Sequence, residues 1–315
     1  MKQNLPILFL SLMVVLSCNQ PVQNSRLRIR KAVDTVGFAH EGRQMDSVMA
    51  RILDTQMALL SKARSMKGNE NIDTWRIAVC PHDDYSYVGY LYPAILENVK
   101  AKTIFLIGVA HKAKQLGLED RIIFESFNRW KSPYGMVRVS SLRQDIISHL
   151  PENFYIVSDS MHMIEHSLEA LIPYLQFYNN EIEIIPILVP YMSIERMEQI
   201  AQLLAYAIKE VAMGYHMTWG KDFAMVISND AVHYGDDDWG GRNYAPYGAD
   251  SSGYKQAVDH EKEIMDNCLT GEVNPGKIAH FVRYTVKEDN YKEYKWTWCG
   301  RYSVPFGLLT AYHLQ

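Results

Sequence analysis

The sequence predicts an α/β fold with three layers, α/β/α, around a central sheet that is mostly parallel or mixed. Two observations lead to this prediction. Short, continuous apolar runs, typical of strands buried on both faces, alternate with longer segments of helical periodicity. The chain has 315 residues, 48% of them hydrophobic and 22% charged, which suits one large globular domain with a full core.

The predicted elements alternate along the chain. Strands are expected over residues 76–80, 103–108, 155–157, 183–189 and 223–228. Helices are expected over residues 45–63, 89–99, 142–150, 167–178, 194–211 and 254–269, with Ser167 capping the fourth. Because helices separate most of these strands, helices should cover both faces of the sheet.

The N-terminus has the pattern of a targeting signal. Lys2 precedes an apolar run over residues 5–16, which is too short to span a bilayer but has the length of a signal-peptide core. Val15-Leu16-Ser17-Cys18 then resembles the lipobox of bacterial lipoproteins, although a buried N-terminal helix with an incidental Cys is the alternative. We expect a signal peptide at residues 1–18, a linker at 19–36, and export to the periplasmic or surface side of a bacterial membrane, anchored by lipid at Cys18.

Charge and cysteine content exclude several classes of protein. The net charge is -4, and the one basic cluster, at residues 26–31, is short enough to be a solvated linker or an edge strand, so no nucleic-acid partner is expected. Cys80, Cys268 and Cys299 are widely spaced and odd in number. They therefore predict neither a disulfide framework nor a CxxC zinc site, and at least one thiol should be free.

Three histidines follow the ends of predicted strands. They are His82, His111 and His233. The carboxyl ends of strands in open α/β sheets line the ligand crevice, so one site could receive all three side chains. A single histidine in such a place is more often a structural residue, whereas three at equivalent positions favour a functional cluster. Imidazole ligands suit zinc, iron or copper.

Carboxylates accompany these histidines. Asp83 and Asp84 directly follow His82, and Asp230 lies three residues before His233. Each could be a metal ligand, a partner that orients an imidazole, or a general base. The alternative is loop solvation and turn capping, which is harder to accept for Asp230 because it lies at the strand end.

Two further segments have catalytic patterns. Residues 162–166 match the H-x-x-E-H pattern of zinc peptidases. That motif requires both histidines on one helix face, whereas the predicted helix starts only after His166, so we expect His166 to lie near the site without forming that motif. Cys299 is followed by Gly and Arg, which would suit a thiol nucleophile paired with a histidine, although a buried inert Cys is the commoner case.

Six segments, taken in order, resemble the Memo family, including the B component of the AmmeMemoRadiSam system, whose fold is similar to that of class III extradiol dioxygenases. Pro-His-Asp-Asp-Tyr-Ser-Tyr-Val-Gly at residues 81–89 resembles the family's P-H-A-G-Y-x-Y-x-G. The other matches are residues 108–111 with G-P-S-H, 165–175 with E-H-S-x-E and a later P-F/Y-L, 185–189 with I-P-x-L-V, 228–235 with S-S-D-x-x-H-x-G, and 299–301 with C-G-R. Together they span roughly residues 37–312, and their combination is more specific than any one of them.

The resemblance implies a divalent metal ion, either iron, copper or zinc, held by His82, His111 and His233. It also implies that His166, Asp230 and Cys299 line the same site as candidate catalytic residues. Two departures matter. Asp83-Asp84 replaces the family's Ala-Gly, and the chain stops at Gln315, where relatives usually continue with more strands. We therefore expect a Memo-like domain over residues 37–315 that lacks the C-terminal strands of the family.

These observations lead to three functional hypotheses. The first is a metal-dependent enzyme, an iron or copper oxidoreductase acting on a small molecule. The second is an exported lipoprotein that binds a peptide or small ligand in the same cleft without catalysis. The third is a hydrolase that uses Cys299 as its nucleophile.

Overall fold

The computed structural model describes residues 27–34, 36–66, 74–235 and 244–315. The predicted signal peptide and Cys18 lie outside the described residues. Within the described ranges, no helix is both long enough and apolar enough to cross a membrane.

A mixed, mostly parallel sheet forms the centre of the described chain. Its strands follow the order β1-β5-β6-β8-β3-β9-β2, with β4 against β8 and β7 against β4. Only the β5–β6 and β4–β8 pairs are antiparallel. The strands are β1 (Ile29–Arg30), β2 (Ile77–Cys80), β3 (Thr103–Val109), β4 (Ile122–Phe124), β5 (Arg129–Ser132), β6 (Gly135–Val139), β7 (Tyr155–Val157), β8 (Glu183–Val189) and β9 (Phe223–Ser228).

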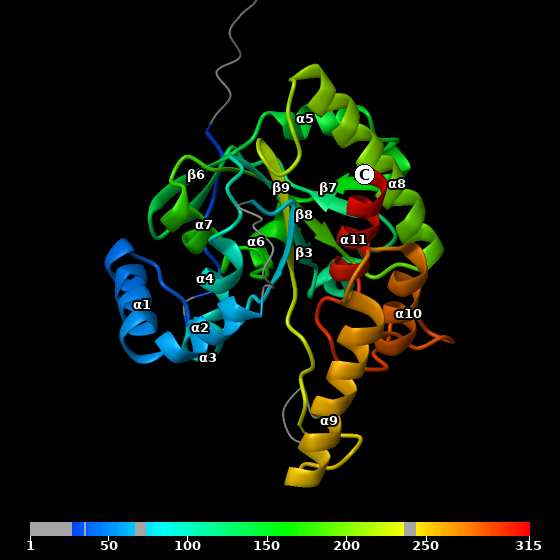
Figure 1. Cartoon of the computed structure of the whole chain (residues 1–315). Helices are drawn as coiled ribbons and strands as arrows, with labels where there is room; N and C mark the ends of the chain where they lie inside the picture. The colour runs from blue at the N-terminus through cyan, green and yellow to red at the C-terminus, as the bar shows by residue number, and fades with distance from the viewer. Residues whose placement is uncertain (1–26, 35, 67–73, 236–243) are drawn as a thin grey trace, which may run out of the picture.

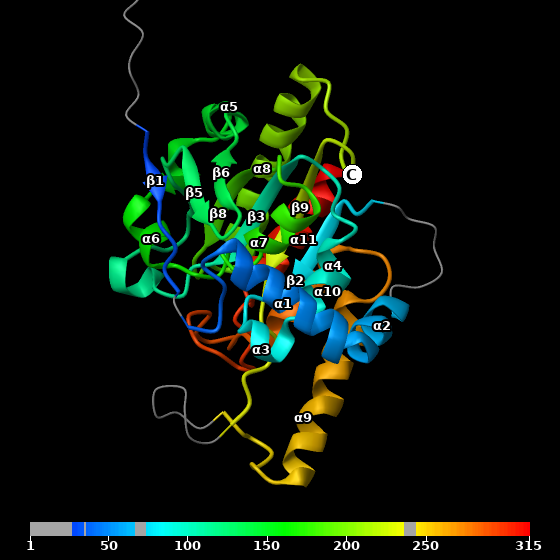
Figure 2. The ribbon, with the colours of Figure 1, turned by 90° about the vertical axis from the view of Figure 1, so that its left-hand side faces the viewer.

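Helices cover both faces of this sheet, which confirms the three-layer α/β/α prediction (Figures 1 and 2). The helices are α1 (Gly42–Thr55), α2 (Met57–Ser65), α3 (Tyr85–Val88), α4 (Leu91–Leu96), α5 (Leu142–Ser148), α6 (Asp159–Ile164), α7 (Ile172–Tyr178), α8 (Ile194–Gly214), α9 (Ser251–Ile264), α10 (Pro275–Thr285) and α11 (Ser303–Leu314). In Figure 1, α1, α2, α4 and α7 lie on one side of the sheet and α8, α10 and α11 on the other, while α9 projects from the body.

Successive side chains of the central strands pack alternately into two separate apolar cores, one on each face of the sheet. On β3, Phe105 and Ile107 pack into the core beneath α8 and α11, whereas Ile104 and Leu106 pack into the core beneath α1, α4 and α7. Successive strand residues point to opposite faces, so a strand buried on both faces has to be apolar throughout. The continuous apolar runs in the sequence therefore correspond to strands that are covered on both faces.

The predicted helices are present, but two of them differ from the prediction. The helix predicted over residues 45–63 is divided at Gln56 into α1 and α2. The helix predicted from Ser167 begins only at Ile172, with Pro173 in its first turn. Ser167 therefore caps no helix. It is buried, and its hydroxyl donates to the Val109 carbonyl instead.

Part of the predicted linker is structured. Ile29–Arg30 forms β1, which pairs in parallel with β5 at one edge of the sheet, and Arg30 is fully buried. Of the two interpretations of this basic segment, the edge strand is correct for these residues.

The sheet brings three loops to one place. β3, β9 and β2 are neighbours, and both of their pairings are parallel, so their carboxyl ends meet at one edge. His82 lies two residues after β2, His111 two residues after β3, and Asp230 two residues after β9. Parallel strand order thus determines the position of the candidate site.

Candidate metal centre

Three imidazole rings lie in mutual contact at this end of the sheet. The ring centroids of His82 and His111 are 5.2 Å apart, those of His82 and His166 are 5.6 Å apart, and His111 stacks on His166 at 4.9 Å. One nitrogen of each ring lies within 4.8 Å of the others. A second set of donors, drawn from His82, Asp230 and Cys299, meets the same distance limit.

All six predicted site residues lie at this end of the sheet: five of them belong to the two donor sets, and His233 contacts the thiol of Cys299. His166, predicted as a catalytic residue, completes the imidazole triplet with His82 and His111. His233 is in neither of the two donor sets found among the described residues. Its Nε2 lies 2.8 Å from Cys299 Sγ, so it borders the centre through the thiol. The role of His233 as a metal ligand stays a prediction.

A relay of hydrogen bonds determines which nitrogen of His82 carries the proton. The Ser228 hydroxyl has a single hydrogen, which it donates to the Ser167 carbonyl. Ser228 Oγ also lies 2.7 Å from His82 Nδ1, so there it must accept a hydrogen from the ring. We infer that His82 is protonated at Nδ1 and that its Nε2 bears the free lone pair, the form that binds metals.

The lone pair of His82 faces another acceptor. His82 Nε2 is buried and 3.1 Å from Asp230 Oδ2, yet it has no hydrogen-bond partner among the described residues. Two acceptors at this separation repel each other unless a proton or a cation lies between them. The Asp230 carboxylate is held in place by the His82 backbone N–H, which donates to Oδ1 at 2.9 Å.

A buried carboxylate orients His111. Glu165 Oε1 lies 2.9 Å from His111 Nδ1, and Oε2 accepts from the His111 backbone N–H at 2.7 Å. Oε1 also accepts from the backbone N–H groups of His166 and Ser167, both at 3.0 Å. An imidazole that donates Nδ1–H to a carboxylate presents Nε2 to a metal, the arrangement common among zinc-bound histidines.

Local packing also fixes the position of Cys299. Its backbone N–H donates to the Asp230 carbonyl at 3.1 Å, and the next N–H, that of Gly300, donates to Asn229 Oδ1 at 3.0 Å. A Cβ on Gly300 would lie 2.2 Å from that Asn229 oxygen, so no larger residue fits. The thiol is buried and free, as are those of Cys80 and Cys268, which confirms the prediction of at least one free thiol.

The buried groups differ in charge. Burial, together with the neighbouring histidines, lowers the pKa of His82 well below its usual value, and burial lowers that of His233 to about 4. Burial also opposes protonation of His111, but hydrogen bonds to Cys299 and Glu165 outweigh it and raise the His111 pKa to about 10. Burial raises the pKa of Asp230 to about 6. At neutral pH, His82 and His233 are therefore neutral and His111 carries a positive charge.

The two aspartates that distinguish this chain from the family pattern have different positions. Asp84 caps α3, where its side chain accepts from the Ser86 N–H at 2.6 Å, as the capping alternative predicted. Asp83 is exposed, and its carbonyl accepts from the Tyr92 hydroxyl at 2.7 Å. Neither belongs to the two donor sets found among the described residues.

The donors fit a transition metal ion. Two or three neutral imidazole nitrogens and a thiol are the borderline to soft ligands that zinc, copper and iron accept, whereas magnesium and calcium prefer sets of oxygen ligands. The lone pair of His82 Nε2 and the Asp230 oxygen already point at common space. A metal would have to displace the Nε2 proton of His111, since only deprotonated ligands bind.

Sequence reasoning missed two residues that act on these donors. Ser228 and Glu165 both lie inside motifs quoted above, but motif letters alone do not reveal which side chain orients which ring. Two signals could have indicated these roles: Ser228 is the last residue of an apolar run, and Glu165 directly precedes a histidine. Both side chains are buried.

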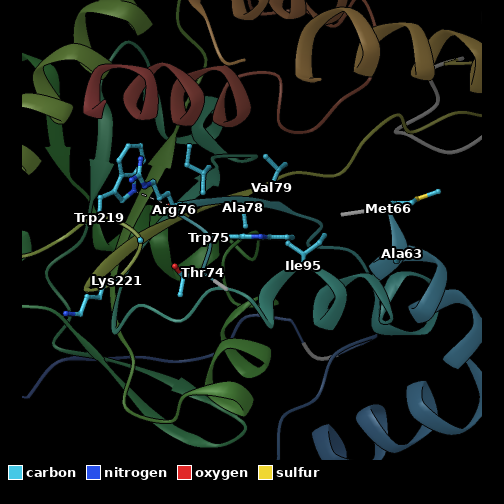
Figure 3. A pocket seen from close by; sticks show the side chains of 12 residues that line it. Ala63, Met66, Thr74, Trp75, Arg76, Ala78, Val79, Ile95, Trp219 and Lys221 are labelled. Carbon is cyan, nitrogen blue, oxygen red and sulfur yellow. Dashed lines mark hydrogen bonds between the residues drawn. The ribbon is translucent and has the colours of Figure 1, made fainter. Parts of the chain in front are cut away.

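A pocket elsewhere in the molecule shares no residue with this centre. It has a volume of about 910 Å³ and runs along β2 at the edge of the sheet (Figure 3). Trp75, Ile77, Ile95 and Trp219 line it, and the Arg76 guanidinium lies over the Trp219 ring at 5.4 Å. The polar centre at the carboxyl ends and this largely apolar pocket are separate features.

The fold and the centre together define a class: α/β proteins with a histidine-rich polar cluster at the carboxyl ends of a mostly parallel sheet. Within that class, this chain belongs to the Memo family, because the family model for Memo-like proteins matches residues 46–315. The family resemblance inferred from the motifs is thereby confirmed.

Relatives support the same assignment. A MEMO1 family protein of Pyrobaculum aerophilum is 27% identical over 164 residues, covering 50% of this chain and 52% of the relative. A MEMO1 family protein of Aquifex aeolicus is 30% identical over 157 residues, covering 49% and 52%. The chain thus spans about half the length of the curated relatives it matches. The crystal structure of an uncharacterized protein from Escherichia coli K12 is similar at 13% identity and a TM-score of 0.41, over 69% of this chain and 78% of that one, which is too distant to add to the assignment.

Proposed function

We propose that the protein is a metal-dependent enzyme, an oxidoreductase acting on a small molecule, with its metal ion held at the cluster around His82 and His111. The observation that carries the proposal is the buried lone pair of His82 Nε2, which faces an Asp230 oxygen at 3.1 Å without a hydrogen-bond donor among the described residues. Such an arrangement is stabilised by a bound cation.

His82 and His111 supply two ligands in this proposal, each oriented by a partner on its other nitrogen. The third comes from His166, Cys299 or the His233 of the motif, all of which lie at or beside the pair. Iron, copper and zinc are the candidate ions. When bound, such an ion supplies Lewis acidity and, for iron or copper, a site for electron transfer.

The protein's own residues would prepare the site for chemistry. Asp230, with a pKa raised to about 6 by burial, can exchange a proton near neutral pH. His166 is the most exposed of the three imidazoles, with 31% of its side chain accessible, and would contact an incoming small molecule first. Burial of His82 and Cys299 excludes water from the inner part of the centre.

Two other functions are the alternatives to a metalloenzyme. A lipoprotein that binds a peptide or small ligand without catalysis would keep the centre but need no metal. Cysteine chemistry is favoured by the 2.8 Å contact between His233 Nε2 and Cys299 Sγ, but the 3% exposure of Cys299 leaves little access to a substrate. The metalloenzyme is therefore the first choice.

The test is the metal content of the chain lacking residues 1–18, purified without chelators and measured by mass spectrometry of the elements. Wild type should carry iron, copper or zinc near one ion per chain, and the triple variant His82→Ala, His111→Ala, His233→Ala should carry none. His149→Ala, which changes an exposed histidine outside the cluster, is the control and should keep its metal. Absence of metal from wild type, even after reconstitution, would leave ligand binding as the better account.

We further propose that the protein is exported and lipid-anchored at Cys18, on the basis of the lipobox resemblance. Mass spectrometry of the full-length protein expressed in a bacterium should find an acylated N-terminal Cys18. The variant Cys18→Ser should lose the lipid and leave the membrane fraction. An unprocessed N-terminus on the wild-type protein would rule this out.

A further inference from the structure

Arg30 is a fully buried charge whose side-chain hydrogen bonds all go to residues 162–169, beside the proposed metal centre. Its Nε donates to the His162 carbonyl at 2.8 Å, and its Nη1 donates to Glu169 Oε2 at 2.5 Å. Its Nη2 donates to the carbonyl of Glu165. The guanidinium also stacks on the Trp130 ring, with its carbon 4.1 Å from the ring centroid.

One loop receives all three of these hydrogen bonds. Residues 162–169 run from the end of α6 past Glu165 and His166 to Glu169. The carboxylate of Glu165 faces His111, while its carbonyl faces Arg30. Arg30 therefore binds the backbone of the residue that orients a proposed ligand, although Arg30 itself is bonded to none of the donor side chains.

Glu169 connects the same arginine to the N-terminal segment. Its carboxylate accepts from the backbone N–H of Val33 at 3.0 Å and from that of Asp34 at 2.7 Å. The Asp34 carboxylate in turn lies 3.9 Å from His166 Nδ1. The segment over residues 30–34 is thus bonded to the loop at both ends and borders the half-buried imidazole of His166.

We propose that Arg30 is a positioning residue of the metal centre: by holding the Glu165 carbonyl, it keeps the Glu165 carboxylate directed at His111. The consequence for metal binding rests on the proposed function, whereas the effect on His111 does not. Burying an arginine is costly, and a hydrophobic residue of similar volume often stabilises a fold as well or better. Three directed bonds to one loop, two of them to backbone carbonyls, indicate a positioning role, since the fork of a guanidinium fixes geometry where a simple charge does not.

The variant Arg30→Met tests this, with Arg143→Met as the matched control. Arg143 also forms a buried pair with a glutamate, 2.6 Å from Glu125 Oε1, and also donates to a backbone carbonyl, that of Phe127 at 2.9 Å. It touches neither Glu165 nor His111. Both variants lose a comparable ion pair, so a general loss of stability should appear in both. Arg30→Lys keeps the charge but not the fork, and provides a milder variant if Arg30→Met does not fold.

The first measurement uses no metal. In the metal-free protein, the Nδ1–H proton of His111 should give a protected NMR resonance, which is assigned by its loss in His111→Ala. Arg30→Met should lose that resonance, Arg30→Lys should weaken it, and Arg143→Met should keep it. If Arg30→Met or Arg30→Lys folds and keeps the resonance unchanged, or if wild type shows no such resonance, the positioning role is wrong.

The second measurement titrates each protein with Co²⁺ and follows its visible absorption. Arg30→Met should bind Co²⁺ about 10- to 100-fold more weakly than wild type, the usual cost of losing a partner that orients a metal ligand. Arg143→Met should match wild type. Equal affinity of wild type and Arg30→Met would overturn the inference. Absence of Co²⁺ binding by wild type would instead count against the proposed function, and the NMR result would still decide the role of Arg30.

Discussion

His82 and His111 lie side by side in the same centre, but the protein treats them in opposite ways. His82 is almost fully buried and hydrogen-bonded to a neutral hydroxyl, and its pKa is lowered well below the usual value, first by burial. His111 is bonded to the ionised Glu165 and to Cys299, which overcome burial and raise its pKa to about 10. The groups hydrogen-bonded to a buried imidazole, here Cys299 and Glu165 for His111, therefore decide whether it stays neutral or becomes charged.

This difference has a consequence for metal binding. His82 offers a lone pair at every pH above its low pKa, so it needs no deprotonation near neutrality. His111 must release a proton before it can bind, and Glu165 then makes the neutral ring a stronger ligand. Of the two proposed ligands, His82 could therefore bind a metal at neutral pH as it stands, whereas binding by His111 would depend on pH.

The largest expected effect comes from removing the charge of Glu165. In Glu165→Gln, the His111 pKa should fall well below 10, because one of the two groups that favour the imidazolium becomes neutral. Metal affinity, corrected for the competition of protons at His111, should drop about 10- to 100-fold, as the ring loses its orienting carboxylate. NMR titration of His111 and Co²⁺ binding measure the two effects.

Glu125→Gln is the control for that change. Glu125 is another buried carboxylate, paired with Arg143, and its pKa is raised by burial to about 7. Its substitution should leave the His111 pKa and the metal affinity unchanged. An unaltered His111 pKa in Glu165→Gln would contradict the assigned cause of the shift.

A smaller effect is expected from Ser228→Ala. The variant removes the acceptor for His82 Nδ1–H and the donor to the Ser167 carbonyl, so the unfolding free energy should fall by about 1–3 kcal/mol. Metal affinity should fall roughly tenfold, because the ring can then adopt either tautomer. Urea unfolding and Co²⁺ titration provide the measurements.

Thr310→Val removes a buried hydroxyl at a position outside the centre, in α11, where it donates to the Phe306 carbonyl at 2.8 Å. It should cost stability without changing metal affinity. If Ser228→Ala and Thr310→Val behave alike in the Co²⁺ titration, Ser228 does not control the His82 tautomer.

The smallest expected effect is a change in the unfolding free energy of the metal-free protein with pH. The His111 pKa is higher in the folded than in the unfolded chain, so its contribution to stability is complete below about pH 6.5 and is lost as the pH rises toward 10. The His82 pKa is lower in the folded chain, so stability is lost as the pH falls below about 6.5. The unfolding free energy of wild type should thus decline on both sides of neutrality.

Two variants distinguish the alkaline from the acid decline in the unfolding free energy. His111→Gln should flatten the alkaline decline from pH 7 to 9, and His82→Gln should reduce the acid decline. The latter reduction is only partial, because burial also lowers the pKa of His162 to about 3 and that of His233 to about 4. Identical pH profiles for both variants would mean that the two imidazoles do not differ as described.

The sequence predicted the parts of this molecule that depend on local pattern. The five predicted strands are present because each is a continuous apolar run, and His82 and His111 were found because each follows such a run by two residues. The strands that were missed, β4, β5 and β6, have three to five residues, and β5 and β6 alternate exposed with buried positions. The two-residue strand β1 was expected only as one of two alternatives. Such short strands form only when a neighbouring strand pairs with them.

Long-range contacts explain what the sequence could not predict about the site. His166 reaches the imidazole pair because Glu165 adopts an extended conformation after α6, and that loop is held by Arg30, which is 135 residues away from Glu165 in the chain. The later start of the following helix has the same origin, since Ser167 bonds to the Val109 carbonyl 58 residues away. No local pattern contains either contact.

If Cys18 carries the proposed lipid, docking of β1 onto the sheet also limits how far the domain can lie from a membrane. The backbone N–H of Arg28 already donates to Asn128 Oδ1 at 2.8 Å, so only residues 19–27 separate the proposed lipidated Cys18 from the packed body. Fully extended, the ten residue steps from Cys18 to Arg28 reach at most about 36 Å. An anchor at Cys18 would therefore hold the domain close to the bilayer surface.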